Sequence, residues 1–407
     1  MSERRPTPSR AKRLLSVQTI RDGGGAETAL IRMIRQLRSE GWECHVALPS
    51  PPRLAAEYAE AGAILHIVPM ERITLSGNRL RWMVRFVLGW PVSVLRLALL
   101  ARRVRADVVH SNSLHYLHGW AAALLVRRPH VWHAREVVAQ SDAALRLERA
   151  LARRYATTVV AISRAVGDQL DPANVVLVFD LPDPAEFTPA RAGGWRAGVG
   201  VADDTPLVGV ACRIDTWKGI DVLLDAVPLI RRAEPGLEVV VAGDPVGGKE
   251  GYAAELASRA KRLGVRWLGA RHDMAEMLAD LDVFVQVSTL PEPFGLGLVE
   301  ALSSGCPVVA TDAGGPVEIL RRVVPEGGAE VTDRGGRLVP FSDPGATAAA
   351  VVDLLPAATS ATRRRDRPRL IPDLAGGATF GEVFDALVGH PPCPLWRRHR
   401  RRRGPAR

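Results

Sequence analysis

Two carboxylates flank a glycine-containing turn in the segment EPFGLGLVEALSSG, residues 292–305. Glu292 stands before the turn, and Glu300 stands on a helix that we expect to run from about Leu296 to Gly305, where a glycine can end it. The segment follows the expected strand DVFVQVS, so both acids can face a ligand at the carboxyl edge of a sheet. Carboxylates repel phosphate but accept hydrogen bonds strongly from hydroxyl groups, which favours a polyol ligand.

Two cations follow another expected strand, PLVGVAC, in the segment RIDTWKGIDVLLDA. Arg213 and Lys218 flank a turn, and Gly219 lies at the start of the next helix. Arginine offers a planar fork and lysine a mobile point charge, so together they could clamp a pyrophosphate. The alternative is ordinary ion pairing with Asp215 or Asp221. We favour the clamp, because ligands of open α/β sheets bind at the carboxyl ends of the strands.

A glycine run opens the first expected helix, in the segment DGGGAETALIRMIRQL. Gly24 and Gly25 would let backbone amides approach an anionic ligand at the helix N-terminus. A dinucleotide fingerprint needs a further glycine where Thr28 stands, so the run alone is better explained as a tight turn between strand and helix. Taken with the acids and cations, it favours a ligand with a central pyrophosphate and a polyol at each end. A nucleotide sugar is such a molecule.

Short apolar runs alternate with longer amphipathic stretches, which is typical of βαβ units on parallel sheets. The first half contains seven expected strands, at residues 13–18, 44–49, 64–69, 106–111, 130–135, 157–163 and 175–179. The second half contains five, at residues 206–212, 237–243, 265–269, 283–288 and 307–311, with helices expected at 219–233, 251–264 and 274–281. A linker between two Rossmann-like domains is expected at Pro182, Pro184, Pro189 and the segment AGGWRAGVGVADDTP, residues 192–206.

Length and composition agree with a two-domain globular protein. The chain has 407 residues, of which 47% are hydrophobic and 24% charged, unlike a disordered or membrane-spanning chain. The four cysteines have no C-x-x-C spacing, which indicates thiols in a reducing compartment. The basic N-terminus lacks a convincing signal peptide, so we expect a cytoplasmic protein. High arginine and alanine usage hints at a bacterial source.

The charge is divided unevenly along the chain. Residues 1–190 carry +9, residues 191–390 carry −6, and residues 391–407, which we expect to be a disordered basic tail, carry +7. The apolar segment Arg79–Arg105 has at most ten consecutive uncharged residues, too few to span a bilayer. It is either a pair of core helices with arginines outside or a basic amphipathic element on an anionic membrane. Basic residues are not interleaved with aromatics, so no nucleic-acid partner is expected.

At these residues the sequence resembles the retaining GT-B glycosyltransferases of family 4, which use nucleotide-sugar donors. The resemblance extends from the GGGAE loop to about Val388, and its most specific part is the E-x7-E motif EPFGLGLVE followed by ALSSGCPVVATDAGGPVEIL. It implies an α/β GT-B fold with two Rossmann-like domains facing a cleft. Residues 1–190 would form the acceptor domain and 191–375 the donor domain, and a helix within 376–390 would cross back to the first domain.

The resemblance also assigns roles to single residues. Glu292 would contact the hydroxyl groups of the donor sugar and Glu300 the ribose, while the amides around Phe294, Gly295 and Leu296 would meet the sugar and phosphate. By the same resemblance, Arg213 and Lys218 would hold the diphosphate, Gly24 and Gly25 would lie beside the donor across the cleft, and His133, in VWHARE, would lie near the transferred sugar. Without the resemblance, His133, which ends an apolar run, is better explained as a core histidine. The candidate catalytic residues are His133, Arg213, Lys218 and Glu292.

The resemblance implies no cofactor and no bound metal, with the leaving phosphate helping to deprotonate the acceptor. The partners would be a nucleotide-sugar donor and a glycan, lipid-linked sugar or small-molecule acceptor, at an anionic membrane surface if the acceptor is a lipid. The sequence departs from the family where DLPD, residues 180–183, replaces the frequent N-G-V-D. Two other interpretations remain: a sugar-nucleotide epimerase of the same architecture, and a degenerate member that binds nucleotide sugars without turnover.

Overall fold

The computed structural model describes residues 10–19, 24–70, 79–137, 142–170, 174–325, 335–356, 359–372 and 377–389. The expected basic tail, residues 391–407, lies outside these ranges. The chain divides into two compact units, one formed by Met1–Asp180 with Gly376–Arg407 and the other by Leu181–Ala375. The division follows Asp180, ten positions before the expected boundary at 190.

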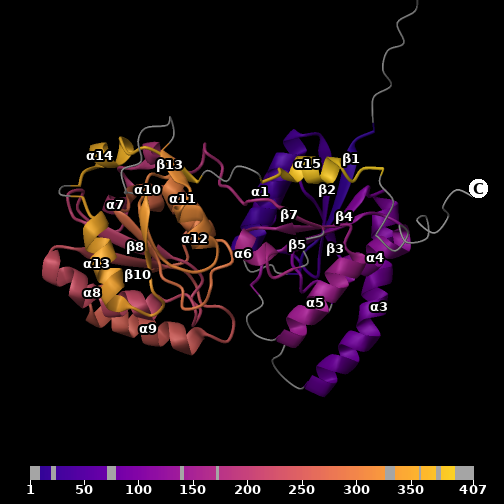
Figure 1. Ribbon diagram of the computed structural model, residues 1–407, viewed down its shortest axis with the longest axis horizontal. Helices are drawn as coiled ribbons and strands as arrows, with labels where there is room; N and C mark the ends of the chain where they lie inside the picture. Colours follow the sequence, from indigo (N-terminus) through magenta and orange to yellow (C-terminus); the bar gives the residue numbers. More distant parts are fainter. Residues whose placement is uncertain are drawn as a thin grey trace, which may run out of the picture. The chain divides into compact units, whose positions relative to one another are not determined.

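The first unit is built on a seven-stranded parallel sheet with the order β3-β2-β1-β4-β5-β6-β7 (Figure 1). Its strands are β1 (Lys12–Val17), β2 (Trp42–Leu48), β3 (Ile64–Ile67), β4 (Val108–Ser111), β5 (His130–Ala134), β6 (Thr158–Ala161) and β7 (Val175–Leu177). The seven strands predicted from the apolar runs are all present. Its helices are α1 (Gly25–Ser39), α2 (Ala55–Glu60), α3 (Arg79–Arg103), α4 (His118–Val126), α5 (Asp142–Tyr155), α6 (Arg164–Gly167) and α15 (Phe380–Asp385).

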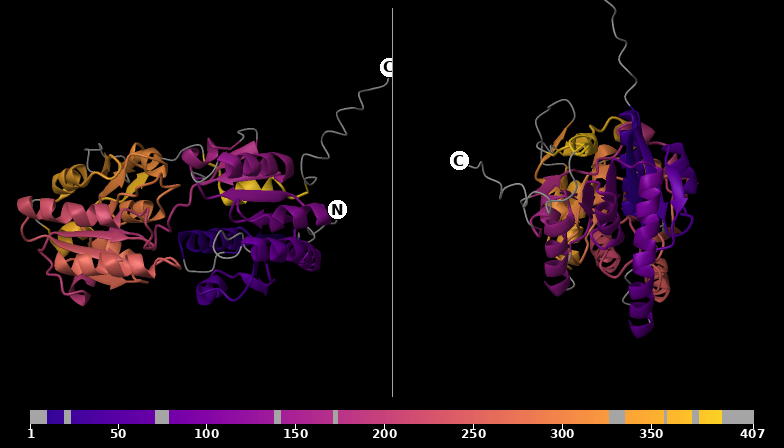
Figure 2. Two further views of the ribbon diagram at one scale, coloured as in Figure 1. Left: turned by 90° about the horizontal axis from the view of Figure 1, so that it is seen from below. Right: turned by 90° about the vertical axis from the view of Figure 1, so that its right-hand side faces the viewer.

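Helices cover both faces of this sheet, so its central strands are buried on both sides (Figures 1 and 2). Leu14 of β1 packs in a core with α1 and α15, whereas the next residue, Leu15, packs in a second core with α3 and α4. The ring of Phe384 in α15 lies 5.8 Å from the ring of Trp42, measured between centroids. The C-terminal helix α15 is therefore part of the first unit.

The segment that was expected to form either a helix pair or a membrane-surface element is one continuous helix, α3. It continues through Pro91, which removes one N–H donor without ending the helix. Leu97, Ala98 and Ala101 are buried in one core with residues of the sheet, so this side of α3 is a core side. Among the described helices, none combines the length and the hydropathy needed to cross a membrane.

The second unit contains a six-stranded parallel sheet with the order β10-β9-β8-β11-β12-β14 and a separate antiparallel pair, β13-β15. Its strands are β8 (Leu207–Ala211), β9 (Glu238–Ala242), β10 (Arg266–Gly269), β11 (Val283–Gln286), β12 (Val308–Thr311), β13 (Val323–Pro325), β14 (Gly336–Val339) and β15 (Leu370–Pro372). Its helices are the 3-10 helix η2 (Pro189–Arg191), α7 (Trp195–Gly198), α8 (Ile220–Ala233), α9 (Glu250–Arg262), α10 (Met274–Asp280), α11 (Leu296–Ser303), α12 (Gly315–Leu320), α13 (Pro344–Leu354) and α14 (Ala361–Arg365). The five strands and three helices predicted for this half are present.

The order of these strands creates a switch point between β8 and β11. From β8 the chain proceeds outward to β9 and β10, and it then returns to the other side of β8 as β11. The loops after β8 and β11 consequently leave the sheet in opposite directions and leave room for a ligand at the carboxyl edge. The predicted cations and acids of this half follow these two strands.

The predicted linker included Pro182 and Pro184, which follow the division after Asp180, but its residues 192–206 are packed within the second unit. The carboxylate of Asp280 accepts hydrogen bonds from the backbone N–H groups of Gly193 at 2.7 Å and Trp195 at 2.9 Å. Arg196 Nη2 lies 2.8 Å from Asp282 Oδ2, and these two side chains are 3% and 0% exposed. Gly193 has a φ of 106°, which lets its N–H turn toward the buried carboxylate. The glycines serve a packed turn rather than a flexible connection.

Candidate functional site

The loops after β8 and β11 meet closely in the second unit. Gly219, between Lys218 and α8, has a φ of 69°, and a Cβ atom there would lie 1.9 Å from the carbonyl oxygen of Val287. The backbone N–H of Thr289 also donates to the carbonyl oxygen of Trp217 at 2.8 Å. Only glycine permits this approach, which brings Lys218 beside the loop that carries the acidic motif.

Lys218 and Glu292 form an ion pair at this edge. Lys218 Nζ lies 2.7 Å from Glu292 Oε2, and the two side chains are 12% and 11% exposed. The hydroxyl of Ser288 donates to the same Oε2 at 3.0 Å, and the ammonium lies 3.9 Å from the centre of the Trp217 ring. The acid and the cation predicted for separate parts of one ligand are thus in direct contact with each other.

The ion-pair partner of Lys218 is neither of the acids considered from the sequence, Asp215 or Asp221. Lys218 pairs with Glu292, and the carboxylate of Asp215 instead accepts a hydrogen bond from Trp217 Nε1 at 3.1 Å. Sequence reasoning placed both groups at adjacent strand ends but did not pair them. Arg213 lies at the same edge, directly after β8, and is exposed. A diphosphate arriving here would compete with Glu292 for the ammonium.

The remaining residues of the acidic motif surround the start of α11. Gly295 is its N-cap with a φ of 99°, Phe294 is buried, and α11 begins at Leu296. N–H groups of a first helical turn have no intrahelical acceptor and favour an anion. Glu300 lies in the second turn of the helix and is 8% exposed. The five predicted positions from Glu292 to Glu300 therefore gather around one helix N-terminus.

The loop after β12 fixes the backbone of Glu292. The backbone N–H of Gly315 donates to the carbonyl oxygen of Glu292 at 2.8 Å, and Gly314 forms an isolated parallel bridge with Glu292. Gly314 has a φ of 73°, and a Cβ atom there would lie 2.2 Å from that oxygen. The two loops can meet here because Gly314 has no side chain.

The first unit carries a polar network at the carboxyl edge of its own sheet. Arg135, after β5, forms a buried ion pair with Asp180, after β7, and its Nε donates to Asn112 Oδ1 at 2.9 Å. Asn112, after β4, donates through Nδ2 to the carbonyl oxygen of Ala26 at 3.0 Å. The network therefore connects three strand ends to the start of α1, where Gly24 is the N-cap.

This network gives a physical reason for the unusual DLPD segment. Its first residue, Asp180, supplies the counter-charge to Arg135, and both side chains are almost completely buried. Glu136 faces elsewhere, because it accepts hydrogen bonds from Ser113 Oγ at 2.5 Å and from the backbone N–H of Arg135 at 3.1 Å. The side chains of Arg135 and Glu136 thus have separate partners, and the charge of Asp180 is balanced by Arg135.

His133 lies in β5 within a cluster of buried histidines. Burial, with smaller contributions from Arg135 and His110, holds its pKa well below the usual 6.5. Its Nδ1 lies 3.3 Å from His110 Nε2, whose ring contacts Ser16 Oγ through Nδ1 at 2.9 Å. Among the described residues, its Nε2 has no hydrogen-bond partner. His133 is therefore a neutral imidazole in the chain Ser16–His110–His133, and the proton arrangement of this chain decides whether Nε2 donates or accepts.

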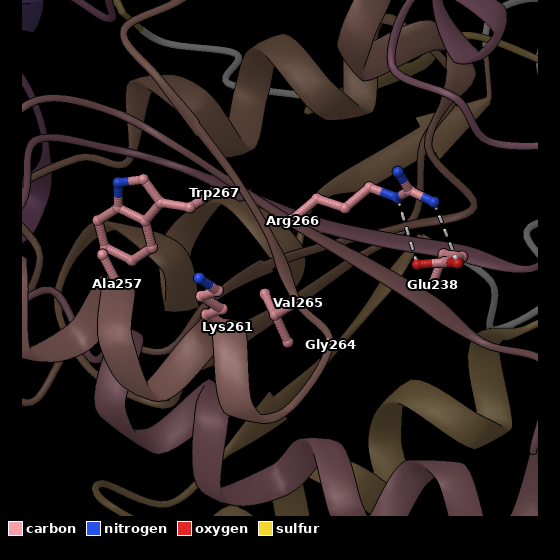
Figure 3. Close-up of a pocket in the computed structure, with 7 residues that line it drawn as sticks. All are labelled: Glu238, Ala257, Lys261, Gly264, Val265, Arg266 and Trp267. Carbon is pink, nitrogen blue, oxygen red and sulfur yellow. Dashed lines mark hydrogen bonds and ion pairs between the residues drawn. The ribbon is translucent and has the colours of Figure 1, made fainter.

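A hollow of the second unit lies at the other end of its strands (Figure 3). Glu238 begins β9 and Arg266 begins β10, so the hollow borders the amino ends of these strands. Arg266 Nη2 lies 3.3 Å from Glu238 Oε1 at one side of it. The residues that line it are Glu238, Ala257, Lys261, Gly264, Val265, Arg266 and Trp267. None of the predicted site residues is among them, so the hollow is separate from the candidate site.

The two parallel Rossmann-like sheets are those of the GT-B fold, and comparisons with known proteins show the family of the chain. Residues 205–356 match the family model "Glycosyl transferases group 1" and residues 23–175 match "Glycosyltransferase Family 4". The chain belongs to this family, and it is a glycosyltransferase that uses a nucleotide-sugar donor.

Two relatives and one solved structure illustrate the similarity. A D-inositol 3-phosphate glycosyltransferase from Stackebrandtia nassauensis is 29% identical over 77% of this chain and 76% of its own length. A phosphatidyl-myo-inositol mannosyltransferase from Mycobacterium tuberculosis is 36% identical over 33% of each chain. The crystal structure of Anabaena Alr3699/HepE in complex with UDP aligns with a TM-score of 0.69 at 24% identity, over 92% of this chain and 100% of that chain. This last likeness shows the fold.

Proposed function

We propose that the second unit binds a nucleoside diphosphate sugar at the carboxyl edge of β8 and β11, and that the enzyme transfers the hexosyl group with retention of anomeric configuration. The observation that carries the proposal is the Lys218–Glu292 pair. A nucleotide sugar has a phosphate bonded directly to a hydroxyl-bearing ring. A cation and a carboxylate 2.7 Å apart match these two neighbouring groups.

Each predicted residue has a role in this proposal. Arg213 and Lys218 hold the diphosphate, and the amides around Phe294, Gly295 and Leu296 meet the phosphate and sugar. Glu292 accepts hydrogen bonds from sugar hydroxyls, and Glu300 accepts them from the ribose. The family resemblance adds Gly24, Gly25 and the neutral imidazole of His133, from the first unit, as donor contacts; because His133 is 0% exposed, this role requires that its Nε2 become accessible to the donor. The burial that lowers the pKa of His133 suits it to a polar contact with an uncharged sugar.

The proposed reaction exchanges one bond at the sugar for another. The bond between the anomeric carbon and the leaving phosphate oxygen breaks, and a bond to the acceptor oxygen forms on the same face. The acceptor proton passes to the leaving phosphate. Positive charge develops on the sugar while negative charge gathers on the phosphate, so Arg213 and Lys218 lower the barrier by electrostatic stabilisation. These two cations take the place of a metal ion in the scheme.

The proposed acceptor is an anionic molecule with free hydroxyl groups, handled in the cytoplasm or at the inner face of the membrane. The net charge of +9 on residues 1–190 supports this choice. The names of the relatives point the same way, because they include D-inositol 3-phosphate and phosphatidyl-myo-inositol. A mannosyltransferase of lipopolysaccharide core biosynthesis from Rhizobium meliloti, 28% identical over 55% of this chain, adds cell-envelope glycans to the candidates.

A transfer assay tests the proposed function. The purified chain would be incubated with UDP- and GDP-hexoses and with inositol phosphate or phosphatidylinositol, and products would be identified by mass spectrometry and their anomeric configuration by NMR. We expect transfer that persists in EDTA, and a loss of about 100-fold or more in kcat for Lys218→Met. Lys261→Met, which changes an exposed lysine of α9, is the matched control.

Other outcomes would contradict the proposal. Transfer that survives Lys218→Met would remove that side chain from the mechanism. Conversion of the nucleotide sugar into an isomer without any acceptor would indicate the epimerase. Binding of nucleotide sugars without turnover by any acceptor in the panel would indicate the non-catalytic alternative.

A further inference from the structure

One side of α3 exposes a continuous row of large apolar side chains. Leu88 is 69% exposed, Val92 46%, Leu95 56% and Leu99 63%. Their spacing of four, three and four residues places them on one face of the helix, opposite the side that packs on the sheet. From Leu88 to Leu99 the row is about 17 Å long at 1.5 Å per residue. We call these four side chains the α3 apolar row.

Only positive charges accompany the α3 apolar row on its helix. The α3 sequence contains six arginines and no acidic residue. Arg96, Arg102 and Arg103 are exposed, and by helical spacing they flank the row on both sides. The neighbouring helix α4 adds the exposed Leu125, whose carbonyl oxygen accepts a hydrogen bond from Arg102 at 3.4 Å, so it borders the row. α3 and α4 lie side by side in Figure 1.

We propose that the α3 apolar row docks on an anionic lipid bilayer, with the helix lying in the plane of the interface. The apolar side chains would enter the boundary between headgroups and acyl chains, and the flanking arginines would contact lipid phosphates. This arrangement buries apolar surface and meets negative charge at the same time. It goes beyond the proposed donor chemistry, because it assigns a membrane contact to a helix of the first unit that carries none of the proposed site residues.

The charges favour a bilayer over two other occupants. A symmetric dimer through this face would place the arginines of one α3 near those of the other, since a two-fold contact pairs a surface with itself. Like charges would then oppose association. Residues 391–407 of the chain carry seven arginines and no acid, so they have nothing to complement Arg96 or Arg103.

Vesicle flotation tests this surface on the full-length chain. The vesicles would be phosphatidylcholine alone and phosphatidylcholine with 30% phosphatidylglycerol, and the test variant would be Leu95→Gln/Leu99→Gln. Leu229→Gln, which changes an exposed leucine of α8 in the second unit, is the matched control. A third variant, Arg96→Gln/Arg103→Gln, removes the flanking charge. The C-terminal arginines are present in all variants, so their contribution to binding is constant.

We expect the wild type to bind anionic vesicles and to bind neutral vesicles weakly. The double leucine variant should lose about ten-fold or more of its partition coefficient, while Leu229→Gln keeps it. The double arginine variant should bind more weakly and with less dependence on salt. Circular dichroism and nucleotide-dependent stabilisation, which should be unchanged in all variants, separate loss of docking from loss of folding or of the donor site.

Three results would overturn the proposal. One is equal binding of the wild type to both kinds of vesicle, or to neither. Another is anionic binding that the leucine substitutions leave intact, which would assign it to charge elsewhere in the chain. The third is a dimer in sedimentation that Leu95→Gln/Leu99→Gln dissociates, because the α3 apolar row would then be covered by a second copy of the chain.

Discussion

Removal of the Lys218 ammonium tests how charge is balanced at the candidate donor site. Lys218 and Glu292 form a contact of 2.7 Å between side chains that are about nine-tenths buried. Breaking a fully buried ion pair costs about 3–5 kcal/mol, because one charge is left uncompensated. Ser288 Oγ still donates to Glu292 at 3.0 Å, and the slight exposure screens the charge. We therefore expect Lys218→Met to lower the free energy of unfolding of the second unit by about 2–3 kcal/mol.

The companion variants complete a double-mutant cycle. Glu292→Gln should cost about 1–2 kcal/mol, because the amide oxygen still accepts a hydrogen bond from the ammonium. The double variant Lys218→Met/Glu292→Gln should cost less than the sum of the single variants, by about 1–2 kcal/mol. Urea-dependent hydrogen exchange in peptides from β8 and β11 measures the second unit separately from the first.

The control is Lys261→Met, which should change the free energy by less than about 0.5 kcal/mol, because this lysine is exposed on α9. Additivity of the two single substitutions within about 0.3 kcal/mol would refute the reasoning. It would mean that the two charges, although adjacent, do not stabilise each other.

Three further predictions concern stability. Burial lowers the pKa of the three histidines of β4 and β5, so below about pH 6.5 the unfolded state binds protons that the native state does not. The free energy of unfolding should therefore decrease as the pH is lowered, by up to about 1.4 kcal/mol per pH unit for each histidine. His130→Gln should reduce this slope between about pH 7 and 5, measured by urea unfolding, by the contribution of one histidine. Gly314→Ala should lower the free energy of unfolding by about 2 kcal/mol or more, because its Cβ atom would meet a carbonyl oxygen at 2.2 Å, while Gly247→Ala, with open space around it, should be tolerated. Asp180→Ala should cost about 3–5 kcal/mol in the first unit by leaving Arg135 buried without its counter-charge, and a melting temperature equal to that of the wild type would contradict this.

The sheets could be predicted because their central strands are buried on both faces. Such strands appear in the sequence as short apolar runs, as in VVHS of β4 and VFVQ of β11, and glycine or polar residues end them. The edge strand β14 was not predicted, since its four residues, GRLV, contain a glycine and an arginine and are only partly buried. The other edge strands of the two sheets, β3, β7 and β10, were predicted from their apolar runs, so β14 was missed because of its own composition.

The sequence pattern could not predict contacts between residues that are far apart in the chain. The segment of Gly193 was interpreted as a linker because the partner that orders it, Asp280, lies 87 positions away. The motif spacing did bring Lys218 and Glu292 to adjacent strand ends, but the contact between them depends on Gly219 and on the path of two loops. Spacing thus predicted that Lys218 and Glu292 lie near each other, and tertiary packing decided that they pair.

Calorimetric titration with UDP, GDP and pyrophosphate tests the central claim most directly. The proteins would be the wild type, Lys218→Met, Glu300→Gln and the control Lys261→Met. We expect one nucleoside diphosphate to bind, with affinity lowered about ten-fold or more by both Lys218→Met and Glu300→Gln and unchanged by the control. Pyrophosphate, which has no ribose, should respond to Lys218→Met alone. Failure of every nucleotide to bind, or binding that neither site substitution weakens, would contradict the assignment of the donor site to the edge of β8 and β11.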